Sequence, residues 1–238
     1  GVDRRDIFVT TKLAAEAKTF KKSVAAIDKS LQELGLDYID MMIIHSPQPW
    51  RKFRGKDHYE DGNREAWRAL EEAYKAGKLR AIGVSNFEKT DIENILGSCT
   101  VKPMVNQVLA HIGNTPFELI EYLQSMNILV EAYSPVAHGI LLNNQSVQMM
   151  SKKYEVSVPQ LCVRYDLQLG LLPLPKTENP EHMASNSELD FVIAEEDMTT
   201  RKNIEPVRDY GNASVMPVYG GKLNIKSMIS MVMSSRRR

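Results

Sequence analysis

The sequence is poor in the features that mark several classes of protein. Only two of its 238 residues are cysteines, Cys99 and Cys162, far apart and without CxxC spacing. A disulfide framework or a structural zinc site is therefore not expected, and we predict two reduced thiols in a cytoplasmic protein without a metal. Cys162 falls in a helical pattern, where it is expected to pack as a small apolar residue. No apolar run approaches the roughly 18 residues of a membrane span, so no membrane association is expected.

The chain also lacks an excess of charge of either sign. It has 30 basic and 30 acidic residues, so nothing in its balance favours nucleic acid or an anionic membrane as a partner. Its one basic run, residues 236–238, is interpreted as a solvated tail. Neither GxGxxG nor GxxxxGK[ST] occurs, so a Rossmann or P-loop nucleotide site is not supported.

A starting methionine is missing as well. The chain opens on GVDRRDIFVTTK and enters its first predicted strand almost at once. We therefore expect a fold that is joined part-way through.

Six short apolar runs are present, and each ends in a polar residue of a kind that catalysis uses. The residues at these ends are Lys12, His45, Ser85 with Asn86, Gln107, Tyr133 with Ser134, and Lys176. Five of the six runs are followed by a stretch of helical composition. In parallel α/β folds the carboxyl ends of the strands carry the ligand sites, because the loops there converge on one face.

The same runs predict one parallel α/β domain. The predicted strands are 6–12, 39–44, 80–84, 104–108, 128–132 and 171–175. The predicted helices are 18–35, 63–77, 89–96, 116–126, 146–154, 158–168, and two short ones in 179–186 and 194–206. Gly35 and Gly77 are expected to end their helices, and Asn63 is expected to be an N-cap.

Two segments break this rhythm. Residues 46–62 are rich in proline, glycine and charge and hold Trp50, Phe53 and Tyr59, so they are interpreted as a substrate loop after a strand end or as an ordinary surface excursion. Residues 207–238 are expected to form a C-terminal tail.

Taken singly, the strand-end residues have plain structural explanations. Lys12 could bind a neighbouring carboxylate, and His45 could be a core histidine or a proton carrier. Ser85 and Asn86 could hold an amide or cap the next helix, and Tyr133 could stack on a planar ligand or only pack. Lys176, followed by a hydroxyl and a helix start, suits an anion or phosphate.

Together, the segments DIFVTTKL, LDYIDMMIIHSP, GKLRAIGVSNF, VNQV, ILVEAYSP and LPKTENPEHMASN resemble the aldo-keto reductases, in that family's order and approximate spacing. The resemblance covers residues 6–197. It implies a (β/α)8 TIM barrel that binds NADP without a Rossmann domain and reduces small-molecule aldehydes and ketones to alcohols. Strands 3 to 8 of that barrel would lie in residues 1–206, so the first two β/α units would be lacking.

The resemblance also assigns roles to individual residues. Lys12 is similar to the lysine that lowers the pKa of a proton-donating tyrosine, and His45 to the histidine that orients the carbonyl. The implied cofactor residues are Ser85, Asn86 and Gln107 at the nicotinamide carboxamide, Tyr133 stacked on the nicotinamide, Ser134 at the pyrophosphate, Lys176 and Thr177 at the adenosine 2′-phosphate, and Asn186 at the adenine. Trp50 and Phe53 would wall the substrate pocket.

Two departures from the family pattern matter. The aspartate and the tyrosine of the family lie on a segment before the strand of Lys12, and these 238 residues hold no such segment. His182 stands where many relatives carry an arginine on the 2′-phosphate, and histidine lacks the fork and the permanent charge of arginine. NADPH is therefore less strongly favoured over NADH.

Three hypotheses follow. The first is an NADPH-dependent reductase, here in an incomplete form, with a monomer favoured. The second is a non-catalytic nucleotide-binding or regulatory protein on the same scaffold, motivated by the missing proton donor. The third is an unrelated TIM-barrel lyase or aldolase that uses Lys12 or Lys176 as a Schiff base.

Overall fold

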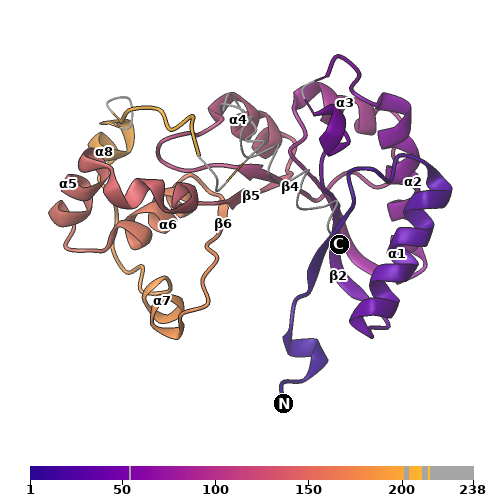
Figure 1. Cartoon of the computed structure of the whole chain (residues 1–238), viewed down its shortest axis with the longest axis horizontal. Coiled ribbons are helices and arrows are strands. Elements are labelled where there is room, and N and C mark those ends of the chain that lie inside the picture. Colours follow the sequence, from indigo (N-terminus) through magenta and orange to yellow (C-terminus); the bar gives the residue numbers. More distant parts are fainter. Residues whose placement is uncertain (54, 201–203, 211–213, 215–238) are drawn as a thin grey trace, which may run out of the picture. The chain divides into compact units, whose positions relative to one another are not determined.

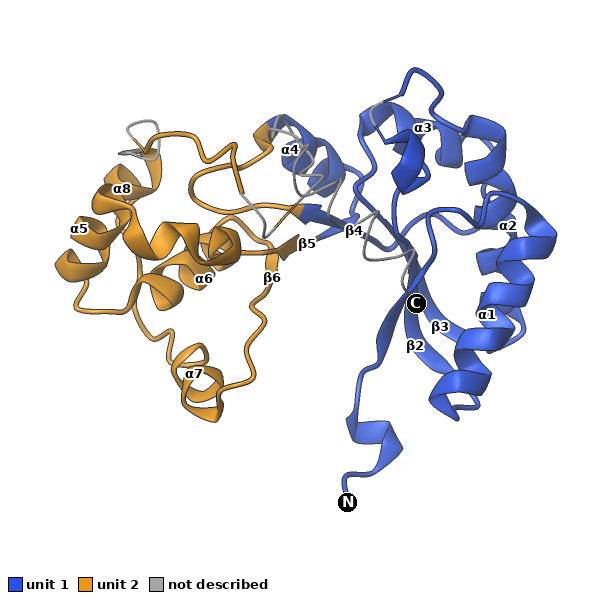
Figure 2. Cartoon of the chain, in the orientation of Figure 1, with its two compact units in different colours: residues 1–108, 118–130 blue, residues 109–117, 131–238 orange. Residues whose placement is uncertain are grey.

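The computed structural model describes residues 1–53, 55–200, 204–210 and 214. The chain forms two compact units, which Figure 2 shows in different colours: residues 1–108 with 118–130, and residues 109–117 with 131–238. The described residues form six strands in the sheet order β1-β2-β3-β4-β5-β6, and the pairs β1–β2, β2–β3, β3–β4 and β5–β6 are parallel.

The elements alternate along the chain as the sequence predicts (Figure 1). The strands are β1 Thr10–Leu13, β2 Ile39–Ile44, β3 Leu79–Ser85, β4 Val105–Leu109, β5 Leu129–Tyr133 and β6 Leu172–Leu174. The α-helices are α1 Phe20–Leu34, α2 Glu60–Lys75, α3 Lys89–Leu96, α4 Phe117–Ser125, α5 Gln145–Lys153, α6 Val158–Gln168, α7 Pro180–Ser185 and α8 Glu195–Thr200. Three short 3₁₀ helices, η1 Arg4–Asp6, η2 Trp50–Lys52 and η3 Ala137–Asn143, complete the described elements.

The core of the first unit is built on β2. Every residue of this strand is buried, as expected for a nearly continuous apolar run in a parallel sheet. Helices α1 and α2 lie side by side along these strands (Figure 1) and bury Ile27, Trp67 and Leu70. The indole N–H of Trp67 donates to the Val101 carbonyl oxygen at 3.0 Å, so the largest core side chain has its one polar group satisfied.

Glycine ends two helices where the sequence predicts it. Gly35, at a φ of 63°, is the C-cap of α1, and its N–H donates to the carbonyl of Gln32. Gly77, at a φ of 75°, follows the Ala76 C-cap of α2. Both positions are left-handed, a conformation that costs glycine little.

Predicted boundaries differ from the observed ones by more than two residues in three places. The last predicted helix, 194–206, is α8 and ends at Thr200, and residues 204–206 are not helical. The first strand begins at Thr10 and not at residue 6, because residues 4–6 form η1 and the Arg4 guanidinium donates to the Ile7 and Tyr38 carbonyls. Asn63 is not an N-cap, because α2 already begins at Glu60.

The second unit contains α5 to α8 and packs its core around α6. Leu161, Cys162 and Tyr165 are fully buried there, as predicted for Cys162, and burial raises the pKa of its thiol. Asp166 is also fully buried, and neither of its carboxylate oxygens has a hydrogen-bond partner within the described part of the chain. Burial raises the pKa of Asp166 well above its usual value.

The start of the predicted tail packs onto this unit. The Val207 N–H donates to the Gly113 carbonyl at 3.0 Å, and the Tyr210 hydroxyl lies 2.8 Å from Nε2 of buried His111. Residues 211–213 and 215–238 of the predicted tail lie outside the described residues. The division into a 1–206 barrel and a 207–238 tail stays a prediction.

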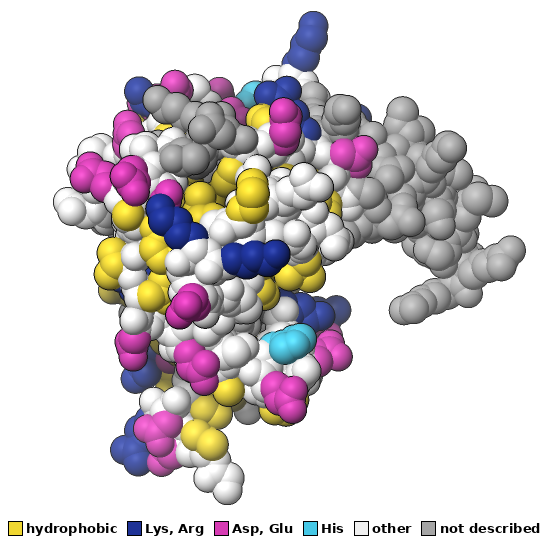
Figure 3. All heavy atoms as spheres, turned by 90° about the vertical axis from the view of Figure 1, so that its left-hand side faces the viewer, with side chains coloured by type: hydrophobic (Ala, Val, Ile, Leu, Met, Phe, Trp, Pro, Cys, Tyr) yellow, Lys and Arg dark blue, Asp and Glu magenta, His cyan; other side chains and the backbone are white. Residues whose placement is uncertain are grey.

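The face of the molecule that Figure 3 presents carries side chains of several types. Hydrophobic side chains are interspersed there with acidic and basic ones. Within the described residues, no helix combines the length and the apolarity that a membrane crossing requires.

Candidate functional site

The first unit brings together the two residues predicted to be catalytic. Strands β1 and β2 are paired in parallel with Lys12 opposite Ile43, and the His45 N–H donates to the Leu13 carbonyl at 3.0 Å. Lys12 and His45 therefore leave the same end of neighbouring strands. Burial lowers the pKa of the His45 imidazole, and the charge of Lys12 lowers it further. His45 is accordingly neutral near pH 7 and can donate a hydrogen bond without carrying a charge.

The residues predicted for the nicotinamide carboxamide form one hydrogen-bonded group. The Ser85 hydroxyl donates to the Gln107 carbonyl at 2.9 Å, and the Asn86 N–H donates to the same oxygen at 3.0 Å. The Asn86 side-chain amide then donates to the Ser85 hydroxyl and to the His45 carbonyl, both at 3.1 Å. Asn86 has a φ of 61°, in the strained left-handed region. Its side-chain amide bonds Ser85 at the end of β3 and His45 just after β2.

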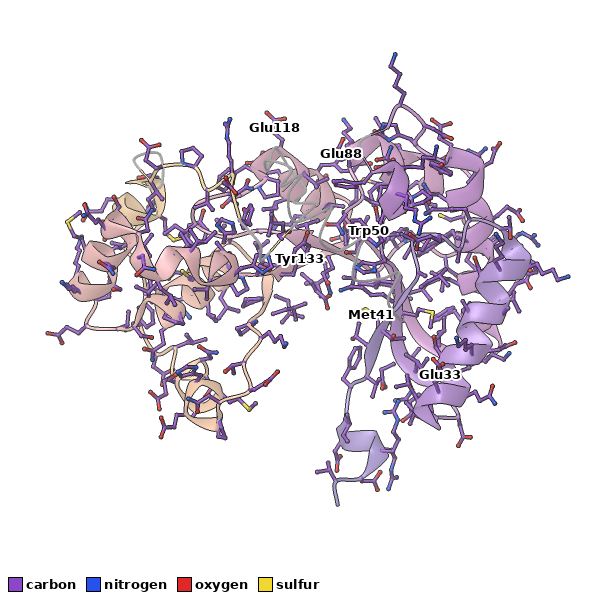
Figure 4. The ribbon with its side chains drawn as sticks, viewed as in Figure 1. Glu33, Met41, Trp50, Glu88, Glu118 and Tyr133 are labelled. Atoms are coloured by element: carbon purple, nitrogen blue, oxygen red, sulfur yellow. The ribbon has the colours of Figure 1, made fainter. Side chains whose placement is uncertain are left out.

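The loop after β2 carries a row of aromatic side chains beside His45, and their role as a wall of the substrate pocket stays a prediction. The indole of Trp50 meets the His45 ring edge-on, with centroids 5.0 Å apart, and Phe53 lies 5.6 Å from Trp50. Figure 4 shows Trp50 beyond the carboxyl end of β2, whereas Met41 lies within that strand. The aromatic side chains therefore extend from His45, the residue predicted to orient the carbonyl.

This loop has an internal frame that keeps it in place. The Gln48 side-chain amide donates to the carbonyls of Gly55 at 2.9 Å and Asp57 at 2.8 Å. The Gln48 N–H in turn donates to the Ser46 hydroxyl at 3.3 Å. These bonds connect the first residues after β2 to residues 55 and 57 of the same loop.

Sequence reasoning missed two residues that hold the loop. Glu16 accepts a hydrogen bond from the main-chain N–H of Trp50 at 3.2 Å. Lys18 donates to the Ser46 carbonyl and to the Asn63 side chain. Both lie between β1 and α1 in the sequence AEAKTF, which looks like an ordinary polar connection. Only their adjacency to the strand end of Lys12 could have drawn attention to them.

Tyr38 is not placed to act as the missing proton donor. It precedes β2, at the opposite end from His45, and its ring lies between the Arg4 and Arg80 guanidinium groups, 4.2 and 4.3 Å from their carbons. The cationic stacking gives Tyr38 a structural role.

The second unit holds the other predicted cofactor residues. Tyr133 ends β5, and burial, together with the nearby Tyr210, raises the pKa of its hydroxyl, so the phenol stays neutral and its ring can serve for stacking. Ser134 follows at a φ of 56°, with its hydroxyl 3.3 Å from Nε2 of His138. The assigned stacking and pyrophosphate roles stay predictions.

The segment after β6 presents an exposed cation and a capped helix. Lys176 is fully solvated and lies 3.6 Å from the Glu178 carboxylate, and the Thr177 hydroxyl accepts from the Asn179 N–H at 3.1 Å. Helix α7 contains His182, which is exposed, and ends at Asn186, whose N–H donates to the His182 carbonyl. Their roles toward the 2′-phosphate and the adenine also stay predictions.

Neither cysteine forms a disulfide, and the described residues hold no cluster of three histidine, cysteine or acidic side chains placed for a metal ion.

Comparison with known proteins places these features in one family. The sequence model described as the aldo/keto reductase family matches residues 1–205. Glyoxal reductase of Bacillus subtilis is 41% identical over 199 residues, which cover 83% of this chain and 68% of that protein. The 9,11-endoperoxide prostaglandin H2 reductase of Trypanosoma cruzi is 37% identical over 202 residues, covering 83% of this chain and 68% of that protein.

Solved structures agree. An aldo-keto reductase from a deep-sea metagenome library, 35% identical, matches 86% of this chain and 73% of its own with a TM-score of 0.77. A Bombyx mori aldo-keto reductase, solved in complex with NADP and 32% identical, matches 85% of this chain and 69% of its own with a TM-score of 0.75. The fold prediction, a (β/α)8 barrel represented here by a six-stranded parallel sheet, is confirmed by these matches.

Proposed function

Because this chain belongs to the aldo/keto reductase family, we propose that it serves the NADPH-dependent reduction of small aldehydes and ketones to alcohols. The observation that carries the proposal is the hydrogen bond from the Asn86 side-chain amide to the His45 carbonyl at 3.1 Å. It ties the residues predicted to hold the cofactor to the residue predicted to orient the substrate.

The residues at the ends of β3 and β4 suit a nicotinamide carboxamide. That group has one acceptor oxygen and two N–H donors, and a partner for it must offer both functions. Ser85, Asn86 and Gln107 carry a hydroxyl and two amides on buried residues at adjacent strand ends. A bound carboxamide would take over bonds that the Ser85 hydroxyl and the Asn86 amide now make within the protein. Buried polar groups of this kind orient a planar amide more tightly than solvated ones would.

The residues after β6 suit a phosphate. Lys176 is an exposed ammonium, and Thr177 offers a hydroxyl beside it. The Lys176–Glu178 pair is fully exposed and therefore weak, so an incoming phosphate would displace the carboxylate at little cost. His182 adds a charge only when protonated, which favours a smaller preference for NADPH over NADH than an arginine would give.

When bound, NADPH supplies the hydride that reduces the carbonyl carbon. The neutral His45 would donate a hydrogen bond to the carbonyl oxygen and fix its position against the Trp50 ring. The ammonium of Lys12, on the next strand, would stabilise the negative charge that develops on that oxygen and on its proton donor.

The substrate proposed is a small dicarbonyl. The Bacillus subtilis relative is named glyoxal reductase, and the aromatic rings of Trp50 and Phe53 next to His45 would accept a compact, flat carbonyl compound. Burial of a small planar molecule against these rings supplies most of its binding energy.

The test is NADPH oxidation by the 238-residue chain in the presence of glyoxal or methylglyoxal, with NADPH binding measured separately by quenching of tryptophan fluorescence. We expect NADPH binding and slow turnover in which water supplies the proton that the family's tyrosine would give, and we expect Lys12→Met to abolish this turnover while binding stays. The exposed Lys21→Met is the matched control.

Binding without turnover by this chain, together with activity of the same chain extended by the family's tyrosine-bearing segment, would mean an incomplete form of a reductase. Binding without turnover by both chains would favour the non-catalytic nucleotide-binding alternative on the same scaffold. Retention of full turnover by Lys12→Met would refute the role assigned to this lysine.

A further inference from the structure

One lysine near the site has no role in the scheme above. Lys18 is mostly buried, and its Nζ donates to the Ser46 carbonyl at 2.8 Å and to Oδ1 of Asn63 at 2.6 Å. Ser46 directly follows His45, and Asn63 lies in the first turn of α2. A single ammonium therefore holds both ends of the loop 46–62.

Asn63 is itself fixed, so the lysine binds a rigid partner. It is fully buried, and its Nδ2 donates to the His58 carbonyl at 3.0 Å, which orients the amide with its oxygen toward Lys18. Nδ1 of His58 lies 3.1 Å from the Asp91 carboxylate of α3. The loop is thus held by a further contact at His58, two residues before α2 begins.

The first turn of α2 lies very close to Lys18 at Gly62. A Cβ on Gly62 would lie 2.9 Å from the Lys18 Cβ and 3.1 Å from the Lys18 carbonyl oxygen, closer than carbon and oxygen atoms pack. The start of α2 therefore approaches the lysine as closely as it does because residue 62 is a glycine.

Burial makes the charged form of Lys18 unfavourable, and the groups around its ammonium offset part of that cost. Burial lowers the pKa of Lys18 to about 7, against the attraction of the Asp91 and Glu16 carboxylates. A lysine that served only solubility would lie in water. Its place under the loop is consistent with a requirement for this particular contact.

We propose that Lys18 is a positioning residue for carbonyl reduction: by holding both ends of the loop 46–62, it sets where Trp50 and Phe53 meet the substrate. The proposal rests on the proposed function. The loop links Lys18 to the substrate site. The main-chain N–H of Trp50 donates to Glu16, and the Trp50 ring contacts the His45 ring.

The first test is steady-state kinetics of Lys18→Met, which keeps the length and removes the charge. We expect the KM for the dicarbonyl to rise about tenfold, as for a lost charged hydrogen bond, while kcat and the KM for NADPH change less than about threefold. Lys18→Arg, which keeps a charged donor, should recover part of the loss, and the exposed Lys21→Met should match the parent chain. Equal losses in kcat and both KM values would overturn the proposal.

The second test needs no turnover, so it separates this proposal from the proposed function. The chain has two tryptophans, and Trp67 is 2% exposed, so acrylamide quenching of the native chain reports mainly on Trp50. Lys18→Met should raise the quenching constant of the Trp50 component about twofold or more, and Lys21→Met should not. Unchanged quenching in a folded Lys18→Met chain would overturn the proposal, whatever the kinetics show.

Discussion

Replacing Asp166 with leucine should stabilise the second unit, and the gain should grow with pH. The carboxylate is fully buried in α6, and neither oxygen has a hydrogen-bond partner within the described residues. A polar group buried in this way costs about 1–3 kcal/mol even when it is neutral. Leucine has the same branching and needs no hydrogen-bond partner, so the substitution removes that cost without opening a cavity, although its larger methyl groups offset part of the gain.

The pH dependence follows from the raised pKa. Burial raises the pKa of Asp166 in the folded chain, so its carboxyl keeps its proton to a higher pH than it does in the unfolded chain. Stability is therefore unaffected by this group below about pH 4 and is lost as pH rises toward the folded pKa, at up to about 1.4 kcal/mol per pH unit. The parent should therefore lose stability relative to Asp166→Leu as pH rises above about 4.

Urea denaturation followed by circular dichroism at pH 5, 6, 7 and 8 measures this difference directly. Asp190→Leu, a change at an exposed aspartate, is the control and should leave the pH slope of the parent unaltered. Parallel pH profiles for the parent and Asp166→Leu would refute the reasoning, because they would mean that the carboxylate has partners or solvent in solution.

Three further predictions concern the first unit. Gly83→Ala should destabilise it by about 1–3 kcal/mol in urea, because the new Cβ would lie 2.7 Å from the Val105 carbonyl oxygen. Asp40→Asn should cost about 1–3 kcal/mol of unfolding free energy at pH 7 and less at pH 3 in the same assay. Burial opposes ionisation of Asp40, but the Val9 N–H and the Arg4 guanidinium lower its pKa. Its stabilisation is therefore present above about pH 4 and is lost as pH falls through the folded pKa. The lowered pKa of His45 predicts that kcat/KM falls with acid at a midpoint below pH 6.5, whereas a fall centred at 6.5 or above would contradict a neutral hydrogen-bond donor.

Much of the fold could be predicted, because it is set by local pattern. The continuous apolar run of residues 39–44 is a fully buried parallel strand, and α6 occupies the predicted span 158–168 with Ser157 as its cap. Gly35 ends its helix because few other residues adopt a left-handed conformation cheaply.

The errors came from contacts between distant residues. Asn63 has the chemistry of an N-cap, but its side chain binds Lys18, 45 residues earlier, and the helix begins a turn sooner. No local signal marks Lys18 as buried, since what covers it is a loop that the chain reaches only later. The strand-end residues could be found because a parallel sheet puts their ends on one side, but the bond from Asn86 to His45 required coordinates.

Among the described residues of the loop 46–62, several of the groups held by side chains are main-chain groups. Glu16 binds the main-chain N–H of Trp50, Lys18 binds the carbonyl of Ser46, and the Gln48 side chain binds two more carbonyls. Backbone groups are the same for every residue type except proline, so side chains that take no part in this anchoring, unlike those of Ser46, Gln48 and His58, can be exchanged while the path is kept. Substrate range could thus be diversified by randomising positions 50 and 53 alone, with the anchoring residues left in place and the library expected to stay folded.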